Sequence, residues 1–325
     1  MLTLSLDPVV ARRLATFLRW SGGPVARSNH WKHFGERNRI AVDEAGSVAR
    51  LAAGEGFDGT FELNFRARSA RERLGLLWRS LRGRDEERLH RESFLALWKD
   101  GEARLEAAAR VLGAPMTPQK VLACHYFALL SPQLERSAPK RYLEIGAGAG
   151  YFAALVHEKF RSSIAIVDLP EILPLGFLFM HARFPPVPYG LPNEEERLRD
   201  ADRAGFVFLT PDQADILATA SFDVAVNTAS FGEMLPEQIA GYFRLLRRVL
   251  RPEGLFFTVN REEKWMNDPS VPVEQNRPGH GIAVRFDDYP WSARDRDLLL
   301  EPSAIHARVQ PQNPMRVRLC HLAAG

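Results

Sequence analysis

Apolar residues at helical spacing dominate the first third of the chain. Between Val9 and Trp20 they recur every three or four positions, which predicts an amphipathic helix. The same spacing returns from Ala70 to Leu112, with an interruption around Gly83. Thr117 followed by Pro118 predicts another helix start, because the first helical turn leaves its N–H groups unpaired and proline has none to lose. Residues 1–136 are therefore predicted to form a helical domain for substrate binding or oligomerisation.

From residue 137 onward, short apolar runs alternate with helical stretches, which is the pattern of a parallel sheet covered by helices. Two further strands are predicted at the end of the chain, and the short connection between them requires an antiparallel pair. Residues 137–325 are therefore predicted to form an α/β domain with a mostly parallel sheet and an antiparallel final strand. The predicted strands, with helices after the first, second and fourth, are Arg141–Ile145, Ile164–Asp168, Phe206–Thr210, Phe222–Asn227, Leu255–Asn260, Ala304–Gln310 and Met315–Leu322.

Composition and charge narrow the class of protein. The chain has 325 residues, 46% hydrophobic and 26% charged, with a net charge of +3, which does not indicate nucleic-acid binding. Cys124 and Cys320 are far apart, so neither a disulfide framework nor a zinc site is predicted. The first residues do not show the basic and apolar regions of a signal peptide, so none is expected, and no apolar run approaches the roughly 18 residues of a membrane span. We therefore expect a cytoplasmic protein that binds neither nucleic acid nor membrane.

A glycine-rich turn follows the first predicted strand. The run Glu144-Ile145-Gly146-Ala147-Gly148-Ala149-Gly150 leads from that strand into a helix at 152–160. Glycine allows positive φ angles and the close approach of a ligand to the backbone, although a turn of this kind also occurs without a ligand. The second strand ends on Asp168, where an acidic residue of a doubly wound sheet accepts hydrogen bonds from ribose hydroxyls. A nucleotide-like ligand is therefore predicted at Gly146, Ala147, Gly148, Gly150 and Asp168.

Two kinds of cofactor fit such a turn. A nicotinamide dinucleotide requires Gly-x-Gly-x-x-Gly with its pyrophosphate over the helix N-terminus. In this chain the three glycines are evenly spaced, and the acidic Glu144 precedes them. A carboxylate repels phosphates but attracts the ammonium and sulfonium groups of S-adenosylmethionine. The predicted cofactor is therefore S-adenosylmethionine, with Glu144 among its binding residues and S-adenosylhomocysteine as the product.

The run Asn227-Thr228-Ala229-Ser230-Phe231-Gly232-Glu233-Met234 resembles the bacterial sugar O-methyltransferases, which are class I S-adenosylmethionine-dependent methyltransferases. The resemblance extends to Asp168-Leu169-Pro170-Glu171, Tyr242-Phe243 and the segment from Asn260 to Lys264, and it covers roughly residues 140–290. It implies a Rossmann-like seven-stranded sheet with an antiparallel final strand. It also implies methyl transfer to a hydroxyl of a sugar or a sugar-bearing small molecule, with Leu169 beside Asp168 in the cofactor site.

The loops at the carboxyl ends of the strands supply the candidate catalytic residues, because ligands of open α/β sheets bind there. Glu233 is either the general base, a hydrogen-bond partner of a sugar hydroxyl, or a carboxylate that stabilises a helix dipole. Asn227 and Ser230 either line the methionine end of the cofactor or cap a local turn. Arg261 either binds an anionic substrate group or forms a structural ion pair. His280, in a Pro-Gly-His-Gly loop, is a further candidate base because histidine titrates near neutral pH.

Several alternatives stay open at the level of sequence. His30 and His33 beside Trp31 are weaker candidates for the base, and Asp287-Asp288 with Glu233 has no spacing that requires Mg²⁺, so no metal is expected. The acceptor group can instead be nitrogen, carbon or a carboxylate in a natural-product pathway. A module that binds the cofactor without catalysis is a third possibility. The expected partners are a small-molecule acceptor, which can be glycosylated, and a second copy of the chain bound through the helical N-terminal domain.

Overall fold

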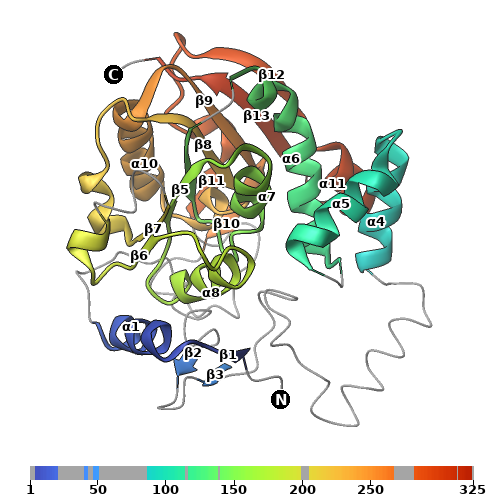
Figure 1. Ribbon diagram of the computed structural model, residues 1–325. Helices are drawn as coiled ribbons and strands as arrows, with labels where there is room; N and C mark the ends of the chain where they lie inside the picture. The colour runs from blue at the N-terminus through green and yellow to red at the C-terminus, as the bar shows by residue number, and fades with distance from the viewer. Residues whose placement is uncertain are drawn as a thin grey trace.

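The computed structural model describes residues 4–20, 40–42, 47–50, 86–113, 116–137, 140–198, 205–266, 282–312 and 314–323 (Figure 1). The predicted helix at 9–20 is confirmed as α1 (Pro8–Arg19), and the start at Pro118 is confirmed by α6 (Pro118–Ser137). Helices α4 (Glu86–Leu97) and α5 (Gly101–Leu112) confirm the later part of the predicted 70–112 segment. Residues 70–85 lie outside the described ranges.

A large mixed sheet forms the centre of the described chain. Its eight strands are arranged in the order β12-β13-β9-β8-β4-β5-β7-β6. All neighbouring pairs from β9 to β6 are parallel, whereas β13 is antiparallel to both β9 and β12. The bounds are β4 (Arg141–Ile145), β5 (Ser163–Val167), β6 (Tyr189–Gly190), β7 (Phe206–Leu209), β8 (Phe222–Thr228), β9 (Leu250–Arg261), β12 (Arg296–Pro302) and β13 (Met315–His321).

The predicted fold class and antiparallel final strand are confirmed, with two differences in detail. The short strand β6 extends the expected seven strands to eight. The predicted strand at Ala304–Gln310 is wrong, because Ala304–Val309 is helix α11 and the penultimate strand is β12. The apolar Ile305, Ala307 and Val309 alternate with polar residues, which is the pattern of a strand. The Ala307 N–H nevertheless donates to the Ser303 carbonyl at 3.0 Å, which is the bonding of a helix. Strand β12 was not predicted from the sequence, because most of its side chains are exposed.

Helices cover both faces of the sheet, as alternating side chains require. Tyr142 of β4 joins the apolar cluster under α6, α7 (Tyr151–Phe160) and α8 (Leu173–Arg183). Its neighbour Leu143 joins the opposite cluster under α10 (Pro236–Val249). Successive residues of a strand point to opposite faces, so a strand that is apolar at every position is buried on both sides. The three predicted helices after the first, second and fourth strands are confirmed as α7, α8 and α10 (Figure 1).

The described N-terminal residues also contain a small antiparallel sheet, which the prediction of helices alone did not include. Its order is β1 (Leu4–Ser5), β3 (Ser47–Arg50), β2 (Ile40–Val42), and it lies beside α1 (Figure 1). Helix α1 is joined to the β6 region, because the Arg13 guanidinium pairs with the Glu194 carboxylate at 2.5 Å and covers the Tyr189 ring at 3.9 Å. The proposed domain boundary at 136/137 stays a prediction.

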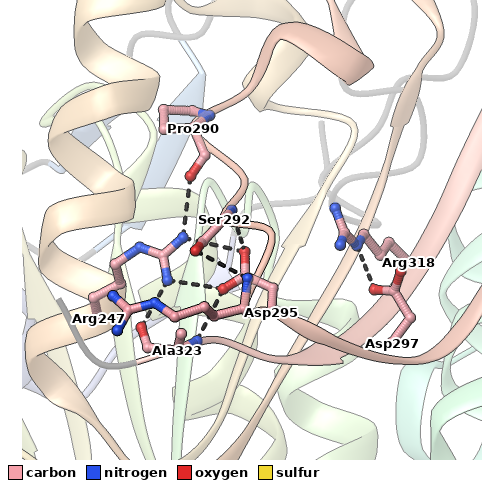
Figure 2. A network of polar contacts seen from close by, with 8 residues as sticks. Arg247, Pro290, Ser292, Asp295, Asp297, Arg318 and Ala323 are labelled. Atoms are coloured by element: carbon pink, nitrogen blue, oxygen red, sulfur yellow. Dashed lines mark hydrogen bonds and ion pairs between the residues drawn. The ribbon is translucent and has the colours of Figure 1, made fainter.

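A polar clamp fixes the segment that leads into β12 (Figure 2). Arg247 of α10 binds both carboxylate oxygens of Asp295, at 2.9 and 3.1 Å, and donates to the carbonyls of Pro290 and Ala323. Burial acts to raise the pKa of Asp295, but bonds from Arg247 and from the backbone N–H groups of Ser292 and Ala323 outweigh it, so that this pKa lies below its ordinary value. The clamp therefore joins α10, the β12 approach and the end of the chain.

An antiparallel pair of strands, β10 (Glu263–Met266) and β11 (Ile282–Arg285), follows β9 along the chain. It begins directly after the carboxyl end of β9, and Arg285 Nε bonds Glu263 across it at 3.0 Å. The described part of the chain contains no helix that is both long and apolar enough to span a bilayer.

Candidate functional site

The candidate site lies where the parallel strands β4, β5, β8 and β9 end. Parallel strands bring their carboxyl ends to one edge of a sheet, and this edge is where ligands of doubly wound folds bind. The register places Ile145 of β4 beside Val167 of β5 and Asn227 of β8. The glycine turn, Asp168 and the segment after β8 therefore meet, as the sequence predicted.

The glycine turn has the backbone that its sequence requires. Gly146, Gly148 and Gly150 have φ angles of 68°, 57° and 74°, in the left-handed region that disfavours other residues. Gly146 N–H donates to the Val167 carbonyl at 2.8 Å, which holds the turn against β5. At the far end, Gly150 N–H donates to the Ala147 carbonyl at 2.9 Å. The turn is thus a fixed feature of the backbone.

Asp168 links the end of β5 to this turn. Its carboxylate accepts the Gly148 N–H at 2.8 Å and the Leu169 N–H at 2.7 Å. Burial raises its pKa to about 7, the two N–H groups oppose that change, and the charges of Glu171 and Glu233 raise it further. A carboxylate offers about four acceptor positions, so two bonded N–H groups leave capacity for ribose hydroxyls. Asp168 and the turn therefore fit the ribose of S-adenosylmethionine.

Glu144 lies beneath the turn. Its side chain is only 1% exposed, and one carboxyl oxygen accepts a hydrogen bond from the Tyr142 hydroxyl at 2.9 Å. Burial raises the pKa of Glu144 to about 8, so the carboxyl is mostly protonated at neutral pH. Glu144 as a cofactor-binding residue stays a prediction.

Asn227 and Ser230 belong to a buried hydrogen-bond network. Asn227 Nδ2 donates to the Ile145 carbonyl at 2.9 Å and to Ser230 Oγ at 2.5 Å. Asn260 Nδ2 donates to Asn227 Oδ1 at 2.7 Å, and Asn260 Oδ1 accepts the Gly232 N–H at 3.2 Å. The network joins the ends of β4, β8 and β9, which is the turn-fixing role that the sequence left open. Contact of Asn227 and Ser230 with the cofactor stays a prediction.

Glu233 forms an ion pair with a residue that the sequence did not single out. Lys264 Nζ of β10 lies 2.9 Å from Glu233 Oε1, with side-chain exposures of 12% and 22%. Burial lowers the pKa of Lys264, Glu233 opposes this change, and Arg261 adds to it. The charge of Arg261 also helps to lower the pKa of His306 of α11. The structure therefore brings Glu233, Arg261 and Asp168 into one charged region.

Other candidates are placed elsewhere or not described. His30, Trp31, His33 and His280 lie outside the described residues. Within the described ranges, no group of three or more histidine, cysteine or acidic side chains could hold a metal. The residues missed by sequence reasoning are Asn260 and Lys264. The available signal for both was the resemblance of the segment from Asn260 to Lys264, and Asn260 is in addition, like Asn227, an asparagine at the carboxyl end of a strand.

The mostly parallel sheet with its antiparallel strand β13 has the arrangement that the resemblance to class I methyltransferases implies. Comparison with known proteins finds no matching family model and no matching curated protein. Solved structures with low overall similarity include a SAM-dependent methyltransferase from Methanosarcina mazei, at 14% identity and a TM-score of 0.37, over 60% of this chain and 98% of the other. The pyocyanin biosynthetic protein PhzM has 12% identity, a TM-score of 0.39 and coverages of 71% and 61%. Human N-acetylserotonin methyltransferase in complex with SAM has 11% identity and a TM-score of 0.35, over 71% of this chain and 59% of the other.

Proposed function

We propose that this chain is an S-adenosylmethionine-dependent O-methyltransferase that acts on a hydroxyl of a sugar or a sugar-bearing small molecule. The observation that carries the proposal is the glycine turn bonded to Asp168 at the carboxyl edge, with Glu233 close enough to raise the Asp168 pKa. The turn gives a ligand access to the backbone, and Asp168 has acceptor capacity for ribose hydroxyls.

The charges around the turn favour this cofactor over a dinucleotide. Asp168, Glu171 and Glu233 place acidic groups beside the turn, with Lys264 paired to Glu233. Such a surrounding repels a pyrophosphate and attracts the sulfonium and ammonium groups. When bound, S-adenosylmethionine supplies a methyl group that is already activated for transfer.

The residues of the chain then have three tasks in methyl transfer. Asp168 and the glycine turn hold the nucleoside, while the Asn227–Asn260 network fixes the loop that carries Glu233. The bound cofactor would supply the methyl group and leave as the neutral thioether, while the Glu233 carboxylate would accept the proton of the acceptor hydroxyl. General-base help of this kind contributes on the order of 10²–10⁴-fold. The choice of a sugar hydroxyl is supported by the resemblance of the Asn227–Met234 run.

A panel of acceptors incubated with methyl-labelled S-adenosylmethionine tests the proposal. We expect label on hydroxyl-bearing sugars or glycosides, and a loss of on the order of 10²-fold in rate for Glu233→Gln. Label that appears only on amines would contradict the hydroxyl assignment and favour N-methylation.

A further inference from the structure

The Glu233–Lys264 ion pair is a fixed part of the site. Lys264 Nζ lies 2.9 Å from Glu233 Oε1, and both side chains are largely shielded from water. The lysine stem also lies over the turn that carries Glu233, since a Cβ placed on Gly232 would be 3.8 Å from Lys264 Cδ. A shielded pair keeps more of its electrostatic effect than a surface pair, which solvent and salt screen.

This pair acts within a cluster of charges of both signs. Glu233 acts on Asp168, whose pKa it raises together with Glu171. Arg261 acts on Lys264, whose pKa it helps to lower. Among the described residues, Asp168, Glu171 and Glu233 on one side and Lys264 and Arg261 on the other therefore influence one another's charges, and the Glu233–Lys264 pair contributes to the local potential.

The substrate and product forms of the cofactor differ in the charge on their sulfur atom, and the local potential acts on that charge. S-adenosylmethionine carries a positive sulfonium with its methyl group, whereas S-adenosylhomocysteine has a neutral thioether without that methyl, and the remaining groups of the two molecules are the same. A negative potential at the sulfur therefore favours the substrate form over the product form, and each added cation reduces that preference. Selective binding of one form requires a difference of this kind, because shared contacts stabilise both equally.

We propose that Glu233 and Lys264 together set how strongly the site prefers S-adenosylmethionine over S-adenosylhomocysteine. In this role the Glu233 carboxylate attracts the sulfonium. Lys264 is a positioning residue that holds the carboxylate in place and offsets part of its charge, so that the product form is released and the substrate form is still preferred. The inference rests on the proposed function, and it concerns binding, so it needs no knowledge of the acceptor.

Calorimetric titration of the full chain with each of the two cofactor forms tests this proposal. The quantity of interest is the ratio of the Kd for S-adenosylhomocysteine to the Kd for S-adenosylmethionine. We expect Lys264→Met to raise this ratio, and Glu233→Gln to lower it, each on the order of tenfold for the loss of one nearby unit charge. Lys264→Arg keeps the charge and should keep the wild-type ratio.

A matched control is available in the exposed pair of Lys159 with Glu135, at the opposite edge of the sheet. Lys159→Met removes the same charge from the chain and should leave the ratio unchanged. A purely structural role for Lys264 would weaken both ligands equally in Lys264→Met, and that unchanged ratio would overturn the proposal. An unchanged ratio in Glu233→Gln would also overturn it. Absence of binding of either form to the wild-type protein would overturn the proposed function itself.

Discussion

Replacement of Gly146 by alanine tests how closely the glycine turn lies against the loop after β8. A Cβ at Gly146 would be 2.1 Å from Ser230 Oγ and 2.5 Å from Ser230 Cβ, distances that require the two segments to separate. Gly150 is the matched control, because its φ of 74° is close to the 68° of Gly146 but its Cβ would meet Met180 Cγ at an ordinary 3.5 Å.

The expected magnitudes follow from these two terms. A non-glycine residue in the left-handed region costs ~1–2 kcal/mol, and this applies to both variants. The steric overlap in Gly146→Ala adds ~1–3 kcal/mol, the usual cost of overpacking a rigid site. We therefore expect Gly150→Ala to lose ~1–2 kcal/mol and Gly146→Ala to lose ~2–5 kcal/mol of unfolding free energy.

Urea unfolding followed by circular dichroism measures both losses, and calorimetry with S-adenosylhomocysteine measures the effect on the site. The double variant Gly146→Ala with Ser230→Gly removes the atoms that overlap, so it should lose less stability than the sum of the single variants. Equal losses in Gly146→Ala and Gly150→Ala would refute the reasoning, because they would show that Ser230 does not restrict the turn.

Three further predictions concern parts of the structure outside the glycine turn. Burial lowers the pKa of His125 and of His306 to about 4 from an ordinary 6.5, so the stability present above pH 6.5 is lost as the pH falls toward 4. The loss of unfolding free energy is ~2 kcal/mol per histidine at pH 5. Urea midpoints at pH 7 and pH 5 should therefore differ less in His125→Phe than in the wild type, and an equal difference would contradict this assignment. Asn260→Ala leaves the buried Asn227 amide oxygen and the Gly232 N–H without their partner. Urea unfolding should show a loss of ~2–3 kcal/mol in unfolding free energy, whereas a loss below ~0.5 kcal/mol would show that the network is not needed for stability. Arg247→Ala removes the cation from the shielded Asp295 carboxylate, which keeps only the Ser292 and Ala323 N–H groups as partners. Thermal unfolding should therefore show a loss of ~3 kcal/mol, and a near-neutral result would contradict the clamp.

The sequence was sufficient where the signal is local. The glycine turn and Asp168 lie next to strong apolar runs, so both the strand ends and the residues at the site could be predicted. Strand β13 was recognised from its own apolar pattern, but its antiparallel direction was inferred from a short connection to an expected strand that is helix α11. Its partner was misplaced because alternation in Ala304–Gln310 imitates a strand, while the true strand β12 is exposed and carries charges at both ends.

The remaining features depend on contacts between distant segments. Lys264 meets Glu233 only because β10 turns back over the loop after β8. The proton on Glu144 depends on complete burial beneath the turn, which no pattern of neighbouring residues reveals. Asn260 likewise finds its partner Asn227 on a strand that is adjacent in space. The order of the strands in the chain indicates this neighbour but not the hydrogen bond.

The central claim is that the site at the carboxyl edge binds S-adenosylmethionine and its product. Calorimetric titration of the purified chain with S-adenosylhomocysteine, beside a parallel titration with NADH, tests this claim most directly. We predict saturable binding of S-adenosylhomocysteine at a single site, weakened in Gly146→Ala, and no binding of NADH. Tight binding of NADH with none for S-adenosylhomocysteine would contradict the account.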